Sequence, residues 1–165
     1  ITPDLIVIGK GLSASLPLSA VIARGDLLKK WKAGAHTSTF QGNPVACAAA
    51  SATLKEIEEA KLIEHVNEII VPCFAKFASE LRNIKNVLEV RFVGAQCAIA
   101  FENSYTANQI QHEAIKKNKI LTYGGGLSGE CVMIIPPINI SKKILSTALT
   151  QLLELISEIQ TKNSR

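Results

Sequence analysis

The amino-acid sequence predicts an α/β fold, and three observations lead to this prediction. The 165 residues are 47% hydrophobic but only 5% aromatic, so Ala, Ile, Leu and Val supply most of the apolar bulk. Such side chains suit helices that pack on a mostly buried sheet. Short apolar runs typical of strands also alternate with longer segments of helical period, and the pattern changes after Asn83.

The first part of the chain is expected to hold two short strands and a short helix. Leu5–Ile8 is an all-apolar run that predicts a buried strand, and a second strand is expected within residues 17–24. A short helix should follow, opened by Asp26 and closed at Gly34. The single tryptophan, Trp31, is expected to belong to the core.

The clearest helix start in the sequence is the pair Asn43-Pro44. Asparagine is a good N-cap, and proline suits the first helical position, where its missing N–H costs nothing. The alanine-rich stretch that follows has high helix propensity. A helical pattern resumes over residues 62–81, where Pro72 is expected to kink or break the helix.

Beyond Asn83 the sequence predicts a second group of strands and helices. One or two strands are expected around Gly94, followed by an amphipathic helix over residues 106–120. An apolar strand should begin at residue 131 and end at a double proline, and a last helix should run from Ser141 to about Gln160. Its apolar stripe comprises Ile144, Leu145, Ala148, Leu149, Leu152, Leu153, Ile156 and Ile159.

Composition and spacing argue against several classes of partner. The net charge is +4, no basic run exceeds two residues and no aromatic residues are interleaved, so nucleic-acid binding is not expected. The sequence has no signal-peptide pattern and no apolar run long enough to cross a bilayer, so no membrane partner is expected. The three histidines lie far apart, so no metal site is expected.

Cysteine usage indicates the compartment in which the protein works. The four cysteines form no CxxC pair and have no regular spacing, so a reduced, cytoplasmic location is expected. Cys47 and Cys97 lie among small apolar residues, which suits buried free thiols.

The chain begins without methionine, just before its first strand, and we expect it to be the remainder of a longer protein.

Lys10 stands where the first apolar run ends, between Gly9 and Gly11. A lysine amine is nucleophilic only after losing its proton, and partial burial at a strand end favours this because desolvation disfavours the charged form. The small flanking residues leave room for a bulky partner above the amine, as a Schiff-base lysine requires. A solvated surface lysine is the alternative interpretation.

Two further segments could bind an anion. Ser38 and Thr39 lie just before the Asn43 cap and could donate hydroxyl and amide hydrogen bonds to a phosphate, with local capping as the alternative. The segment YGGGLSGE, residues 123–130, could cradle an anion with its backbone amides or form a flexible turn.

Three motifs together resemble one enzyme family. They are PDLIVIGKGLSASLPLSAVIAR, GAHTSTFQGNPVACAAA and PPINIS, and they occur in the order and approximate spacing found in class III aminotransferases. That group contains the 4-aminobutyrate and acetylornithine aminotransferases, which are fold-type I enzymes dependent on pyridoxal 5'-phosphate. The resemblance covers essentially all 165 residues and implies the C-terminal half of such an enzyme.

The resemblance implies a role for each candidate site residue. Lys10 matches the lysine that holds the cofactor as a Schiff base and moves a proton once the substrate has displaced it. Thr39 matches a threonine that binds the cofactor phosphate of the neighbouring subunit, which implies a homodimer with shared active sites. Ser38 is the second candidate phosphate ligand. The resemblance therefore implies transamination between an amino compound and a 2-oxo acid.

Two positions depart from the family pattern. Gln41 replaces a glycine common at that position, and Met133 lies where many relatives carry an arginine that pairs with a substrate carboxylate. Because methionine cannot make a bidentate carboxylate contact, glutamate is in doubt as the amino donor. The identity of donor and acceptor is left open.

The resemblance also implies a domain organisation and an expectation about activity. Residues 1–43 would complete a large cofactor-binding domain, residues 44–82 would be connecting helices, and residues 83–165 would form a small α/β domain. Further cofactor contacts lie upstream in the family, so this chain alone is expected to have little activity. A non-catalytic assembly module, or an aminomutase or decarboxylase of the same superfamily, remains an alternative.

Overall fold

The computed structural model describes residues 1–163, and these divide into two compact units. The first unit comprises residues 1–61, and the second begins at Leu62. Both units combine helices with strands, so the predicted α/β class is confirmed. Each unit is described by itself below.

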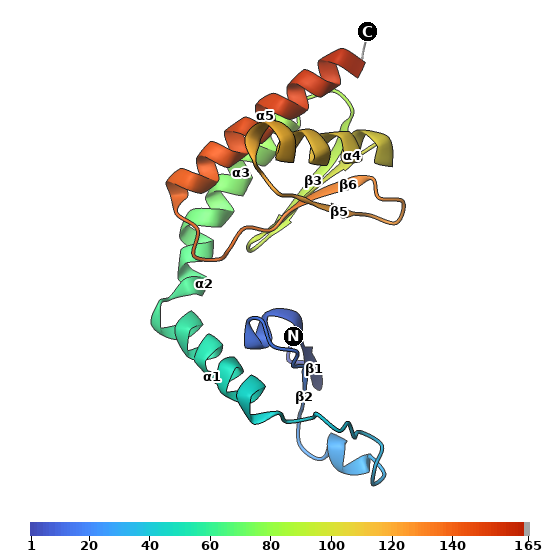
Figure 1. Ribbon diagram of the computed structural model, residues 1–165, viewed down its shortest axis with the longest axis vertical. Helices are drawn as coiled ribbons and strands as arrows, with labels where there is room; N and C mark the ends of the chain where they lie inside the picture. Colours follow the sequence, from blue (N-terminus) through green and yellow to red (C-terminus); the bar gives the residue numbers. More distant parts are fainter. Residues whose placement is uncertain (164–165) are drawn as a thin grey trace. The chain divides into compact units, whose positions relative to one another are not determined.

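The first unit is built on a two-stranded antiparallel hairpin (Figure 1). Strand β1 (Leu5–Ile8) pairs with β2 (Ala20–Ala23), with Leu5 opposite Ala23 and Ile8 opposite Ala20. Two short 3₁₀ helices follow the strands, η1 (Lys10–Ser13) after β1 and η2 (Leu27–Lys30) after β2. The unit ends with the 16-residue helix α1 (Pro44–Glu59).

Helix α1 begins where the sequence predicts. The Asn43 side-chain oxygen accepts hydrogen bonds from the backbone N–H groups of Val45 and Ala46, at 3.0 and 3.1 Å. Pro44 occupies the first helical position, where it removes no hydrogen bond. The predicted cap is therefore confirmed.

In the first unit the expectation of burial is wrong at three places, strand β1, Trp31 and Cys47. Strand β1 is largely exposed, with Val7 at 76%, because its pairing with β2 satisfies the backbone but no described element of the first unit covers its side chains. Trp31 is 45% exposed and stacks on His36 with ring centroids 5.1 Å apart. Cys47 is also exposed, whereas Cys97 is buried as predicted. The identity of an apolar residue does not determine what covers it.

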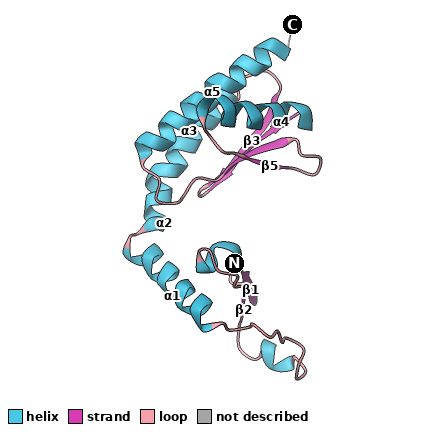
Figure 2. Ribbon diagram, in the orientation of Figure 1, coloured by secondary structure: helices cyan, strands magenta, loops and turns pink. Residues whose placement is uncertain are grey.

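The second unit is a four-stranded antiparallel sheet with its helices gathered on one side (Figure 2). The strand order is β3-β4-β6-β5. The sheet and the helices enclose a continuous apolar core, whose centre includes Phe74, Ile99, Ile110 and Ile156. The elements are α2 (Leu62–His65), α3 (Val71–Leu81), β3 (Val87–Val93), β4 (Gln96–Phe101), α4 (Ser104–Glu113), β5 (Tyr123–Gly125), β6 (Cys131–Ile134) and α5 (Lys142–Asn163).

The sequence predicts a kink or a break at Pro72, and the structure shows a local change of helix type there without an end to the helical path. A π-helical segment, Val66–Ile70, joins α2 to α3, and Pro72 lies immediately beyond it at the start of α3. Proline in a helix interior lacks an N–H and crowds the preceding turn, and a π turn changes the local hydrogen-bond ladder. The wider turn before Pro72 thus lets the helical path continue.

Candidate functional site

Lys10 lies at the end of β1, on the first residue of η1. Its φ angle is 55°, in the left-handed region that non-glycine residues rarely occupy. The following turn is closed by hydrogen bonds from Leu12 N to Gly9 O and from Ala14 N to Gly11 O, both 3.3 Å long. Strain of this kind persists where the surrounding structure holds it, and it is common at functional positions.

The side chain of Lys10 is exposed, so the expected partial burial is wrong for this chain. Its amine makes no ion pair or side-chain hydrogen bond with any other residue of the described range 1–163. The glycines that flank it bring no side chain over the amine, and Gly11 has open space around it. The amine is thus accessible and not committed to a structural contact.

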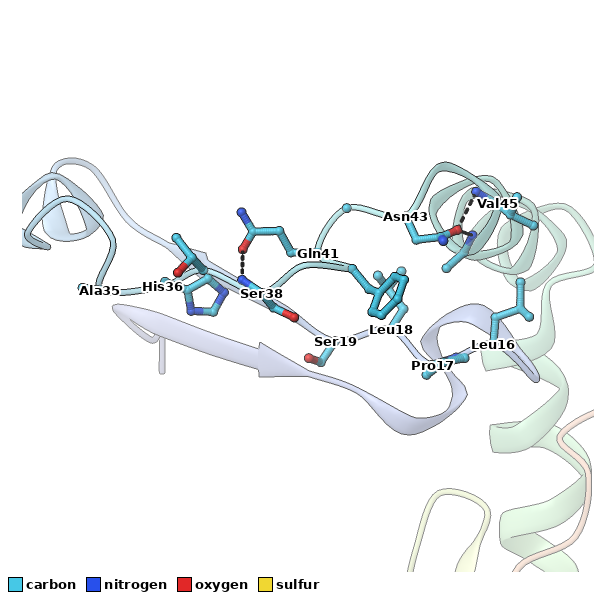
Figure 3. A pocket seen from close by; sticks show the side chains of 14 residues that line it. Leu16, Pro17, Leu18, Ser19, Ala35, His36, Ser38, Gln41, Asn43 and Val45 are labelled. Carbon is cyan, nitrogen blue, oxygen red and sulfur yellow. Dashed lines mark hydrogen bonds between the residues drawn. The ribbon is translucent and has the colours of Figure 1, made fainter.

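Residues 38–41 form a closed turn just before α1 (Figure 3). The backbone N–H of Ser38 donates to the Gln41 side-chain oxygen at 3.2 Å, and the N–H of Gln41 donates back to the Ser38 carbonyl at 3.1 Å. Gly42 follows with a φ of 63°, a conformation that glycine adopts without strain. The turn therefore holds Ser38 and Thr39 in a defined backbone path.

A cavity of about 1000 Å³ opens beside this turn within the first unit. Figure 3 shows Ser38 and Gln41 on one side of it and the 16–19 segment opposite. Ser38 lines the cavity, whereas Lys10 and Thr39 are not among its lining residues. The wall comprises Leu16, Pro17, Leu18, Ser19, Ala35, His36, Thr37, Ser38, Phe40, Gln41, Gly42, Asn43, Val45 and Ala46.

The turn has the donors that a phosphate group requires. The hydroxyls of Ser38 and Thr39 are exposed and have no hydrogen-bond partner within residues 1–163. The first free amides of α1 are taken by Asn43, so the helix N-terminus itself offers an anion few donors. The free hydrogen-bond donors here therefore lie in the turn rather than at the helix end.

The segment 123–130 forms a strand and a turn, and several of its amides already have a partner. The Glu130 carboxylate accepts a hydrogen bond from Ser128 N at 2.8 Å, and backbone N–H groups of Glu130, Ser128 and Leu127 lower the pKa of this carboxyl. A side chain at Gly126 would lie 2.4 Å from that carboxylate. The structure thus favours the turn alternative over an anion cradle.

Met133 lies on the side of the sheet away from the helices. Its partners across the sheet are Ala98 on β4 and Tyr123 on β5. Its sulfur lies over Gly125, where an added Cβ would come within 2.6 Å. The side chain is partly exposed and gives this part of the sheet an apolar surface.

No group of three or more potential metal ligands occurs within the part of the chain that the structure describes. Among the described helices, none is long and apolar enough to cross a bilayer. Sequence reasoning named Ser38 as a candidate phosphate ligand but did not predict the cavity that Ser38 lines. Leu16 and His36 gave no signal as wall residues, because they meet only in the folded unit.

Comparison with solved structures defines the class of protein. The fold matches Plasmodium falciparum ornithine δ-aminotransferase with a TM-score of 0.88 and 31% identity, over 98% of this chain and 41% of that one. The fold is thus a portion of a fold-type I, pyridoxal-phosphate-dependent enzyme. An acetylornithine aminotransferase structure from Elizabethkingia anophelis matches with a TM-score of 0.79 and 28% identity, over 98% of this chain and 42% of that one.

The family model for class III aminotransferases matches residues 1–156, and the chain belongs to that family. Plasmodium falciparum ornithine aminotransferase is 34% identical over 88% of this chain and 35% of its own length. Acetylornithine aminotransferase from Nitrosomonas europaea is 30% identical over 95% of this chain and 39% of its own length. The chain spans less than half the length of these relatives, and the family uses pyridoxal phosphate.

Proposed function

We propose that the protein transfers an amino group between an amino compound and a 2-oxo acid, with pyridoxal phosphate attached to Lys10. Family membership over residues 1–156, together with an accessible lysine in a strained turn at a strand end, supports the proposal. The observation that carries it is the uncommitted amine of Lys10 between two glycines. When bound, the cofactor supplies an electron sink for the substrate carbon.

Lys10 has two tasks in this proposal. Its amine attaches the cofactor, and once released it would move a proton between the substrate α carbon and the C4′ carbon of the cofactor. A lysine amine acts as a base only when neutral, so desolvation must come from surfaces beyond those that the described residues bring to it. We therefore expect little activity from residues 1–165 in isolation.

Ser38 and Thr39 are proposed to bind the cofactor phosphate through their free hydroxyls and the amides of the turn. We further propose a homodimer in which the Thr39 turn serves the active site of the neighbouring subunit. In the whole protein, residues 1–43 would complete the large cofactor-binding domain. Residues 44–82 would form helices that connect it to the small domain, which would comprise residues 83–165.

The substrate is proposed to be one whose binding does not require an arginine at position 133. The Met133 side chain lies over Gly125 and presents a thioether rather than a cation. An apolar part of the amino compound would suit this surface better than a carboxylate.

The free state of all four cysteines supports a reducing compartment, which is consistent with the proposed cytoplasmic location.

The test is chemical trapping on the full gene product. The protein is incubated with pyridoxal phosphate, reduced with borohydride and digested, and the labelled peptide is identified by mass spectrometry. The expected label is on Lys10; it is lost in Lys10→Ala and kept in Lys32→Ala, a matched exposed lysine. Label spread over surface lysines in the unmodified protein contradicts the proposal and favours a non-catalytic module.

A further inference from the structure

The side chain of Gln41 occupies a hydrogen-bond donor of the turn that we propose binds phosphate. Its carboxamide oxygen accepts the N–H of Ser38 at 3.2 Å, and both residues are exposed. Figure 3 shows the oxygen directed at Ser38 and the amide nitrogen directed away from it. The same donor cannot serve a phosphate oxygen while this contact persists.

We propose that Gln41 is an internal competitor of the phosphate: its side-chain oxygen holds the Ser38 N–H in the empty turn, and the phosphate must displace it to bind. This inference rests on the proposed function, because it takes the 38–41 turn as the phosphate site. It assigns Gln41 as a positioning residue that weakens cofactor binding and keeps the empty turn closed.

The Ser38 N–H matters because other donors nearby are already used. Asn43 takes the amides of Val45 and Ala46, Pro44 has none, and Cys47 N donates to the Asn43 carbonyl at 2.9 Å. The N–H of Gln41 is bonded to Ser38 O. The donors left for an anion therefore lie within the turn itself.

Charge increases the importance of each donor. Residues 33–54 contain no lysine or arginine, so this stretch offers an anion only neutral hydrogen-bond donors and the imidazole of His36. Without a cation from the same stretch, a phosphate depends on the number of N–H and O–H groups that reach it. A donor already paired with Gln41 thus reduces the affinity.

The size of the effect follows from the nature of the contact. It is an exposed hydrogen bond between neutral groups, so its net strength lies at the low end for such bonds. Losing it should raise phosphate affinity by about two- to fivefold. A carboxylate at the same position should keep the acceptor and add repulsion, and so weaken binding more strongly.

The test measures cofactor affinity rather than activity, on the full gene product with its cofactor removed. Gln41→Met keeps the length of the side chain but removes the acceptor, and Gln41→Glu keeps the acceptor and adds charge. Binding of pyridoxal phosphate and of pyridoxal, which lacks the phosphate, is followed by absorbance. We expect Gln41→Met to bind pyridoxal phosphate about two- to fivefold more tightly and Gln41→Glu to bind it more weakly.

Pyridoxal binding should be the same in all three proteins, because it has no phosphate to compete. Amide hydrogen exchange in a peptide that contains Ser38 gives a second readout, and it should be faster in cofactor-free Gln41→Met than in the unmodified protein. Unchanged or weaker binding of pyridoxal phosphate to Gln41→Met overturns this inference alone. If the unmodified protein attaches neither compound at Lys10, the proposed function fails and this inference fails with it.

Discussion

At the scale of single residues, the two cysteines expected to be alike differ in their surroundings. Cys97 is 1% exposed, and burial raises the pKa of its thiol to about 12, whereas Cys47 is exposed on α1. A raised pKa keeps the thiol protonated, so Cys97 remains largely protonated even at pH 10. The thiolate is the reactive form.

We therefore predict that a thiol reagent labels Cys47 quickly at pH 8 and at pH 10, and labels Cys97 only on unfolding. The measurement is mass spectrometry of peptides after timed labelling. A Cys47→Ser variant should lose the fast label and keep the slow one. Rapid labelling of Cys97 in the native protein would show that β4 opens far more readily than its burial implies.

Residue-level chemistry explains which local features the sequence can predict. The Asn43 cap and the Pro44 start are local, because the side chain and the amides it bonds lie within three residues. Burial at Cys47 and Trp31 depends on which other segments cover them, and composition does not supply that information. The hydrogen bond between Gln41 and Ser38 is also local, but a glutamine before glycine carries no general turn signal.

At the scale of elements, the last helix offers a matched pair of isoleucines. Ile156 is fully buried in the core of the second unit, and Ile144 near the start of the same helix is 62% exposed. Both belong to the stripe expected to pack, and Leu145 beside Ile144 is buried in the core, so the core reaches the first turn of α5. The periodic pattern identified the helix and its buried face, but it included Ile144, which lies at the exposed edge of that face.

We predict that Ile156→Ala lowers the free energy of unfolding by about 2–5 kcal/mol, because it removes buried methylenes and leaves a cavity. Ile144→Ala should cost about 0.5 kcal/mol or less, since its side chain is mostly in water. Urea denaturation followed by circular dichroism measures both. Equal losses in the two variants would mean that Ile144 is covered in solution.

Helix α3 shows how the structure accommodates a proline that would ordinarily end a helix. Proline usually ends a helix, but the π-helical segment Val66–Ile70 precedes Pro72 and the helical path continues to Leu81. Phe74 and Leu81 beyond the proline are both fully buried, and their burial favours continuation. The π segment thus accommodates the proline locally, and the packing of Phe74 and Leu81 holds the helix that follows.

At the scale of the whole molecule, the sequence motifs predict which residues belong to the candidate site. They do not predict how those residues are arranged in space. The resemblance points to Lys10 and Thr39, and the position before the Asn43 cap points to Ser38; all three are exposed with free side-chain donors. The cavity that Ser38 lines could not be predicted, because its walls come from two segments that meet only after folding. The exposure of β1 could not be predicted either, because burial of its apolar side chains depends on segments outside residues 5–8.

Buried side chains are distributed unequally between the two units. The apolar core cluster lies entirely between Val66 and Ile159. In residues 1–61 the buried side chains are those of Ser13, Ala46 and Ala50, which are small. Apolar burial is the main favourable term in folding, and it must offset the entropy of ordering the chain. Among the described residues, the apolar core that can offset this entropy therefore lies in the second unit.

We predict that a fragment beginning at Leu62 folds alone and unfolds cooperatively, whereas residues 1–61 alone show no cooperative transition. The measurement is thermal unfolding of both fragments by circular dichroism, together with amide hydrogen exchange of the 165-residue chain. Amides of β4 and α5 should be protected, and those of β1 should exchange much faster, because β1 is exposed and paired only with β2 within residues 1–163. Equal protection in β1 and β4 would contradict the prediction, since it would require a cover over β1 that the described residues do not provide.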